Sequence, residues 1–277
     1  MTTTKGNDIM AEPEFTRGPA RRPAPVIEDP ILQWAIGLPT TNRQIYAGWM
    51  LEAGKHDSLD IAMHEAGYQQ VTIKHGSGAV VTHWAVETAN VFVIAEGVQT
   101  PAEMRGTDAR YGIAYGWRTT ESGRRQSVLK VRVLLHELLR AGCYEPLTLT
   151  VKSTLTGDVL DALMRQYDVL NAVDGFRQDD GKPVLNPPLY ACSLPLVAGD
   201  EVTRGSGANT KPVVPPVAGM PVLIGRDYIR AHWIKRDWTA YIEAALDDTI
   251  RWSVAESQRI ATGSDAQLVG RTTEDLI

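Results

Sequence analysis

The chain has 277 residues, of which 43% are hydrophobic and 22% are charged, and its formal net charge is −5. This length is enough for one large domain, or two small ones, with a real hydrophobic core. The acidic balance excludes a protein that is basic over its whole surface, so any nucleic-acid site has to be a local basic patch.

The cysteines and the absence of long apolar runs indicate the cellular setting. Cys143 and Cys192 form no CxxC pair, and the N-terminus lacks the apolar core of a signal peptide. No stretch approaches the roughly 20 apolar residues that a membrane span requires. We therefore expect a cytoplasmic protein with two reduced, structural thiols and no contact with a membrane.

The N-terminal part is predicted to change from a loose arm to helices. Residues 1–30 hold five prolines and few large apolar residues, which predicts an arm that is disordered or ordered by a partner. Residues 31–67 are predicted to be mainly helical. A first helix is expected to begin near Asn42 and to stop at Gly54, and a second to follow over about 57–67.

After Gly67 the apolar residues alternate with polar ones, which is the period of a strand. This pattern predicts a hairpin with strands near 69–75 and 79–86, joined by a Gly-Ser-Gly turn. Short, β-branched runs predict further strands near 90–95 and 147–152.

The stretch from Val128 to Leu139 fits two patterns. Its leucines and valines suit a helix that ends at Gly142, whereas its first half alternates like a strand, and we favour the helix. Thr156 is predicted to cap a later helix whose apolar face includes Val159 and Leu170.

The remaining third of the chain begins with a Pro/Gly-rich excursion. Residues 174–221 carry eight prolines and six glycines, too many for a passive connector, and 189–191 and 222–224 have the composition of edge strands. Residues 222–262 are predicted to form a strand and a long C-terminal helix that packs on the main domain. The polar residues 263–277 are expected to be a loose tail.

Together these elements predict an α+β (or α/β) fold. We expect a small, mostly antiparallel sheet covered by helices on one side in a main domain over residues 31–173. The long excursion and the long C-terminal helix complete this predicted organisation.

The segment from Arg105 to Arg132 is the most informative for function. It contains seven basic residues against two acidic ones, with glycines and aromatic residues interleaved. Single-stranded nucleic acid requires this combination, because cations follow the phosphates and flat rings stack on bases without reading their sequence. The predicted nucleic-acid-binding residues are Arg105, Arg110, Tyr111, Tyr115, Trp117, Arg118, Arg124, Arg125, Lys130 and Arg132.

The same segment also fits a purely structural interpretation. Tyr111, Tyr115 and Trp117 alternate like an ordinary half-buried strand, and glycine-rich basic loops are common on protein surfaces. A second basic-aromatic cluster, over residues 226–238, is better explained as an amphipathic helix whose tryptophans pack on the core.

No motif in the sequence indicates an enzyme. The patterns GxSxG, HExxH, GxxxxGK[ST] and GxGxxG are absent, and the histidines between His56 and His83 lack the spacing of metal ligands. We therefore predict no catalytic residues, no metal and no cofactor.

Three functions remain open from the sequence. The first is a sequence-tolerant, single-stranded nucleic-acid-binding protein that acts as a homo-oligomer through 1–30 and 174–221, in strand protection or annealing during replication or recombination. The second is an architectural or assembly subunit, because long irregular arms also suit exchange between subunits. The third is an enzyme whose active-site residues are dispersed and carry no local motif.

Overall fold

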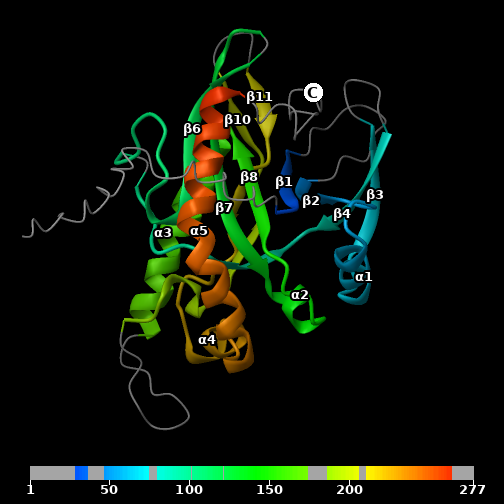
Figure 1. Ribbon diagram of the computed structural model, residues 1–277, viewed down its shortest axis with the longest axis vertical. Coiled ribbons are helices and arrows are strands. Elements are labelled where there is room, and N and C mark those ends of the chain that lie inside the picture. Colours follow the sequence, from blue (N-terminus) through cyan, green and yellow to red (C-terminus); the bar gives the residue numbers. More distant parts are fainter. Residues whose placement is uncertain are drawn as a thin grey trace, which may run out of the picture.

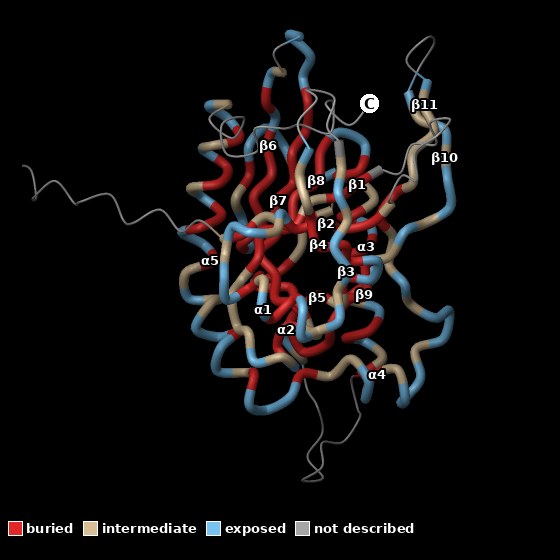
Figure 2. The backbone as a smooth tube through the Cα atoms, turned by 90° about the vertical axis from the view of Figure 1, so that its right-hand side faces the viewer, coloured by how far each residue is buried: buried red, intermediate tan, exposed pale blue. Residues whose placement is uncertain are grey.

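Most of the chain folds around one large sheet. The computed structural model describes the following ranges: 29–36, 47–74, 80–100, 102–120, 122–173, 186–205 and 210–263. The predicted arm and tail lie almost entirely outside these ranges. The central strands are buried, whereas the loop that joins β6 and β7 is exposed at the top of Figure 2.

Ten strands form this sheet, in the order β12-β9-β5-β7-β8-β1-β2-β4-β3, with β6 paired to β7 as a branch. The pairing of β1 with β8 is parallel, and the other pairings in the sheet are antiparallel. The strands are β1 Ile31–Ile36, β2 Ala47–Glu52, β3 Gln69–Lys74, β4 Val80–Val86, β5 Ala89–Val93, β6 Ile113–Thr119, β7 Arg125–Leu135, β8 Leu147–Lys152, β9 Leu194–Ala198 and β12 Pro216–Ala218. A separate two-stranded sheet pairs β10 (Val202–Arg204) with β11 (Lys211–Val213).

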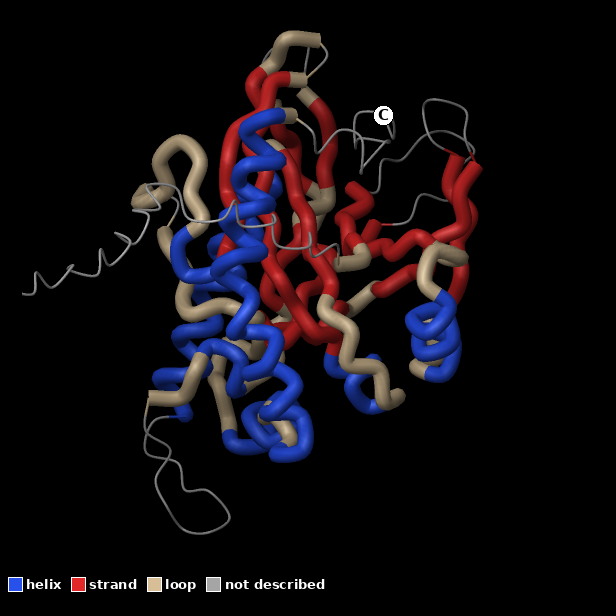
Figure 3. The backbone as a smooth tube through the Cα atoms, viewed as in Figure 1, coloured by secondary structure: helices blue, strands red, loops and turns tan. Residues whose placement is uncertain are grey.

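Helices lie on both faces of the sheet (Figures 1 and 3). The α-helices are α1 Asp57–Glu65, α2 His136–Arg140, α3 Leu155–Val173, α4 Arg226–His232 and α5 Arg236–Thr262, and two short 3₁₀ helices are η1 Arg110–Gly112 and η2 Leu189–Ala191. The side chains of α3 pack with one face of β7 and β8, and those of α5 pack with the other face of β6 and β7.

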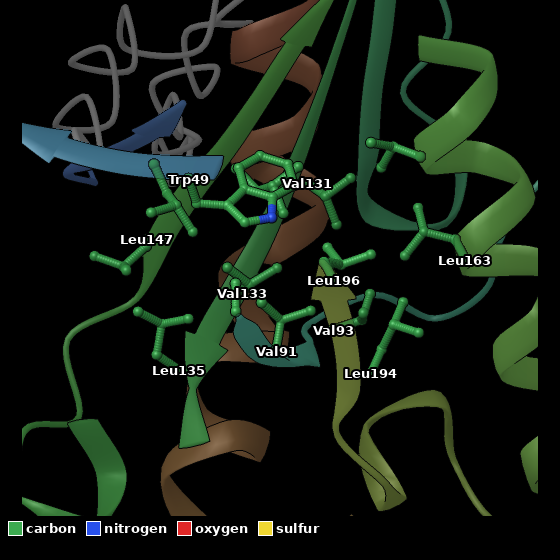
Figure 4. Packing of buried hydrophobic residues seen from close by; sticks show 14 of the residues in the cluster. Trp49, Val91, Val93, Val131, Val133, Leu135, Leu147, Leu163, Leu194 and Leu196 are labelled. Carbon is green, nitrogen blue, oxygen red and sulfur yellow. The ribbon is translucent and has the colours of Figure 1, made fainter. Parts of the chain in front are cut away.

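The central strand β7 divides its side chains between these two layers because neighbouring residues of a strand point to opposite faces. Leu129, Val131 and Val133 join the main core with α3, as the packing in Figure 4 illustrates for two of them. The opposite face carries Val128, which packs with Trp252 of α5, and the charged side chains of Lys130 and Arg132.

The sheet curls around its main core. Trp49 of β2 is fully buried and lies close to Val131 and Leu196 from the other half of the sheet (Figure 4). The indole N–H of Trp34 in β1 donates a hydrogen bond of 2.8 Å to the backbone oxygen of Val214. The N-terminal strands and the segment before β12 therefore enclose the same core.

The predicted small sheet covered by helices on one side is wrong. The sheet has ten strands, is mixed because β1 and β8 are parallel, and carries helices on both faces. The prediction failed because three strand-forming regions were interpreted otherwise: the residues before Gly54, the stretch after Arg125, and the Pro/Gly-rich excursion.

The expected helices within 31–54 are strands β1 and β2 where the structure describes them. Trp49, Met50 and Leu51 are all buried, so β2 is covered on both faces and shows no alternation of polar and apolar residues. The expected start at Asn42 lies outside the described residues. The second expected helix is confirmed as α1, although Ile61 on it is exposed.

The stretch from Val128 to Leu135 is a strand rather than the favoured helix, and only α2 follows it as a short helix. Its neighbours β5, β6 and β8 cover its edges, and helix-forming side chains such as Leu129 fill the core on either side. Tertiary pairing outweighs local helix propensity here.

The Pro/Gly-rich excursion contributes to the same sheet, since β9 pairs with β5 and β12 pairs with β9. Residues 189–191 form η2, and the predicted strand at 222–224 is an exposed turn instead. The long C-terminal helix is two helices, because the chain is extended at Trp233 and Lys235. The predicted strand pair near 69–75 and 79–86 and the strands near 90–95 and 147–152 are confirmed, and the predicted Gly-Ser-Gly turn lies outside the described residues. The helix predicted near Thr156 is also confirmed, but Thr156 lies in its first turn and does not cap it.

Candidate nucleic-acid interface

The β6–β7 hairpin positions most of the predicted binding residues. Its strands pair from Ile113↔Val131 to Thr119↔Arg125. The turn beyond them is fixed locally: the backbone N–H of Thr120 donates to the oxygen of Arg124 (2.8 Å), and Gly123 adopts a positive φ of 79°. A glycine suits this position because other residues rarely adopt that backbone conformation.

Trp117, Arg124 and Arg125 form an exposed cluster at the tip of this hairpin, which we call the tip cluster. The indole of Trp117 is 36% exposed, and the guanidinium carbon of Arg125 lies 4.7 Å from the centre of its ring. Among the described residues, no carboxylate is ion-paired with Arg124 or Arg125. The tip cluster therefore combines an accessible flat ring with two positive charges that no carboxylate in the described ranges neutralises.

Tyr115 lies beneath the tip cluster, in the core rather than on the surface. Its ring makes an edge contact with Trp117, with centroids 6.3 Å apart, and only 9% of the residue is exposed. Burial raises the pKa of its hydroxyl, and the nearby Arg125 opposes that shift. Tyr115 supports Trp117 but cannot stack on a ligand in this conformation.

Arg118 points to the opposite face of β6 and is buried. Its Nε and Nη2 atoms donate to the side-chain oxygen of Gln126 at 2.8 and 2.6 Å. The amide of Gln126 in turn donates to the hydroxyl of Ser153. The guanidinium is thus held inside the fold, away from any phosphate in solvent.

Lys130 is buried under α5. Its Nζ atom lies 2.6 Å from Oε2 of Glu256, and 3% of the lysine side chain and 5% of the glutamate side chain are exposed. Glu256 also pairs with Arg259, one turn further along the helix. Lys130 therefore neutralises an internal carboxylate.

Arg132 is held in the same layer by a separate set of partners. Its Nε and Nη2 atoms donate to the two carboxylate oxygens of Asp29 at 2.8 and 3.2 Å, and Nη1 donates to the backbone oxygen of Ala245. Burial raises the pKa of Asp29, and the hydrogen bond and charge of Arg132 oppose that rise.

The other predicted residues gather around a cavity of about 680 Å³ at the far end of β6. Arg105, Arg110 and Tyr111 line it together with Glu96, Glu103 and Tyr167 of α3. Arg110 is fixed at its rim by an ion pair of 3.3 Å between its Nε and Oδ2 of the buried Asp108. We call this group the cavity cluster.

Six of the ten predicted residues are therefore exposed, in two clusters separated by the length of β6, about 20 Å at the rise of a strand. The other four, Tyr115, Arg118, Lys130 and Arg132, are buried. A search for basic residues missed the acidic wall of the cavity. One signal for Glu103 was available: Thr100 and Glu103 match the capping pattern [ST]-x-x-E, and the backbone N–H and hydroxyl of Thr100 both donate to the Glu103 carboxylate.

The second basic-aromatic cluster, over 226–238, packs its tryptophans on the core, as the sequence indicated. Trp238 is buried with Phe92 and Ile94, and Trp233 packs against the main core.

Within the described ranges no three His, Cys, Asp or Glu side chains are grouped as metal ligands would be. Burial raises the pKa of the Cys192 thiol to about 12, so this cysteine is a poor nucleophile.

Comparisons with protein-family models, with curated proteins and with solved structures found no match. None of the helices in the described part of the chain combines the length and the apolar character needed to cross a bilayer.

Proposed function

We propose that this protein binds single-stranded nucleic acid without regard to base sequence, and that the tip cluster is the primary contact. The observation that carries the proposal is the exposed Trp117 ring with Arg125 lying over it, next to the exposed Arg124 in the same hairpin. Stacking on such a ring contributes about 1–3 kcal/mol per base and tolerates any base. The arginines supply charge for the phosphates.

The cavity cluster extends the proposed path along β6. Arg105 and Arg110 are exposed there, and Tyr111 offers a second ring that is 46% exposed. Tyr111 contacts Gly97 and lies near Tyr167 of α3, and Trp117 contacts Tyr115 in the core shared with α3. Both aromatic residues therefore lie on the α3 side of β6, where one strand can follow them.

In this proposal the protein works as a homo-oligomer that protects or anneals strands during replication or recombination. The segments first expected to mediate assembly were 1–30 and 174–221. Residues 1–28 lie outside the described residues, and β9 and β12 of the second segment pair within their own sheet. The oligomer is therefore tested separately from the nucleic-acid contact.

The first test measures fluorescence anisotropy of a labelled oligo-dT and of a matched duplex with the full chain, over a range of salt concentrations. We expect tighter binding to the single strand, weakening steeply with salt. Replacing Arg124→Ala and Arg125→Ala together should weaken binding at least tenfold. It should also reduce the slope of log affinity against log salt by about 1.4, because two phosphate contacts are lost.

The matched control removes two exposed arginines at the opposite end of the molecule, Arg230→Ala with Arg236→Ala in α4 and α5 (Figure 1). If both double variants weakened nucleic-acid binding equally, the loss would come from net charge alone, and this would contradict the proposed site. Light scattering on the same samples gives the particle size. A large particle that binds no strand at low salt would favour the architectural subunit instead.

A further inference from the structure

The cavity beside β6 has the volume of a small-molecule site. Its volume of about 680 Å³ falls within the roughly 300–1,000 Å³ of known ligand sites. Its walls carry two arginines, two glutamates and two tyrosines, so it offers both signs of charge and flat rings. A ligand that fits this wall has an anionic group, a planar body and hydrogen-bond donors, which is the composition of a nucleotide with an amino group on its base.

Tyr111 is held at the mouth of this cavity in a strained conformation. Its φ is 59° and its ψ is 13°, a left-handed geometry that is uncommon for a tyrosine. The backbone oxygen of Tyr111 accepts a hydrogen bond of 2.8 Å from the N–H of Glu96, and its ring lies against Gly97, where a side chain would come within 3.6 Å of it. Strain of this kind is concentrated at ligand sites, and here it presents an aromatic ring to the cavity.

The carboxylates of the cavity are available to a ligand. The hydrogen bonds from Thr100 hold the pKa of Glu103 below its ordinary value and occupy one of its oxygens, which leaves the other free to accept. Glu96 is exposed, and its carboxylate makes no hydrogen bond or ion pair with the described residues. Carboxylates repel phosphates but accept hydrogen bonds from the amino groups of bases. Glu96 and Glu103 therefore suit contact with a base rather than with the sugar-phosphate backbone.

The arginines lie where the phosphate of such a nucleotide would be bound. Arg105 and Arg110 are both exposed at the cavity. The ion pair with Asp108 fixes Arg110 through Nε, and its terminal nitrogens remain able to donate. The hydroxyl of Tyr167, which also lines the cavity, accepts from the backbone N–H of Val98 at 3.0 Å, so its own proton can be donated to a ligand.

We propose that this cavity takes one unpaired base of the bound strand, with the ring against Tyr111 and an exocyclic amino group donating to Glu96 or Glu103. The inference rests on the proposed function and adds a base preference to it: amino-bearing bases such as cytosine are favoured at this one position over thymine, which has no amino group. The tip cluster contributes no such preference.

The experiment compares binding of the full chain to labelled oligo-dC and oligo-dT of equal length, at a mildly alkaline pH where cytosine is neutral. The readout is the ratio of the two affinities. In the variant Glu96→Gln with Glu103→Gln this ratio should shift toward dT by about tenfold, because an amide can also donate to thymine oxygens. Glu65→Gln with Glu87→Gln, exposed carboxylates outside the cavity, should leave it unchanged.

A second variant separates binding from folding. Tyr111→Gly removes the ring but suits the positive φ, so the chain should fold with an unchanged or raised melting temperature while the dC preference is lost. An unchanged ratio in both variants, with both strands still bound, would overturn the base cavity and leave the proposed function standing. Failure of the unmodified chain to bind either strand at low salt would overturn both.

Discussion

Burial, rather than charge, decides what the basic residues of β6 and β7 do. Arg118, Lys130 and Arg132 look like phosphate ligands in the sequence, but each points to the face covered by α5 and has an internal partner. The sequence shows that side chains alternate between the two faces of these strands, but it does not show which face α5 covers. The distinction depends on Glu256 and Asp29, which lie more than 100 positions away along the chain.

The pair of Lys130 and Glu256 gives a prediction at this scale. Removing one partner, as in Lys130→Ala or Glu256→Ala, breaks the buried ion pair and should lower the free energy of unfolding by about 3–5 kcal/mol. The double variant Lys130→Met with Glu256→Leu should lose much less, because neither charge remains.

Urea unfolding of the two single variants and the double variant measures this difference. Lys55→Ala, which removes an exposed lysine that pairs with the exposed Glu52, serves as the control and should change the free energy of unfolding little. If the double variant lost as much free energy of unfolding as the two single variants added together, the broken ion pair would not be the source of the loss.

At the scale of elements, the strands that were found from sequence are short β-branched runs or alternating segments, and they include β5 and β8, whose residues are almost all buried. The apolar-polar alternation from Val71 to Lys74 predicts β3, whereas β4 is buried on both faces from His83 to Val86. β2 and β7 are buried on both faces, so their apolar runs carry no period and match a helix equally well. Trp117 was correctly grouped with Arg124 and Arg125 because all three lie on one local hairpin.

The close packing of α5 against β6 gives a second prediction. A Cβ atom on Gly116 would lie 2.9 Å from Cγ2 of Ile260, and 3.2 Å from the hydroxyl oxygen of Thr107. Gly116→Ala should therefore push α5 from the hairpin and destabilise the fold by about 1–3 kcal/mol. In an Ile260→Ala background the same change should cost less, since the clashing methyl group is gone.

Thermal unfolding of the four chains tests this coupling. Gly157→Ala in α3 is a matched control, because nothing lies within 4 Å of its added Cβ, and it should be neutral or stabilising. Equal effects of Gly116→Ala with and without Ile260 would mean that α5 does not restrict this position.

At the scale of the whole molecule, two histidines connect the lower helices to the sheet. The ring of His136 lies 5.5 Å from Phe92 and 5.3 Å from Trp238. Burial lowers the pKa of His136 below its ordinary 6.5, and Arg140 and Lys235 add to this effect. Burial also lowers the pKa of His232, with a smaller contribution from His136 and an opposing one from Glu137.

The stability of the fold should consequently fall in mild acid. Above about pH 6.5 both histidines are neutral in the folded and unfolded chain, so they have no differential effect. As the pH falls below that value the unfolded chain takes up protons first, and the free energy of unfolding decreases until the folded pKa is reached. His136→Phe should flatten part of this decrease in urea unfolding measured between about pH 7.5 and about pH 5.5. A decrease identical to that of the unmodified chain would remove His136 from the explanation.

The long-range pairing of the sheet could not be predicted from local pattern. The segment 186–218 looks irregular because of its prolines, yet β9 and β12 complete the edge beside β5. Prolines are tolerated there because Pro195 and Pro216 lie near the edge of the sheet. The cavity beside β6 was equally hidden, because it combines Glu96, Tyr111 and Tyr167 from three separate elements.

The hydrogen bond between Trp34 and Val214 spans 180 residues, and the ion pairs of Asp29 and Lys130 span 103 and 126. During synthesis, β1 and β2 leave the ribosome long before the segments that enclose them. Loop closure over such distances is slow, so the half-made chain exposes Trp34 and Trp49 until its last third is complete. We therefore expect slow refolding and a demand for chaperones that grows when translation is fast.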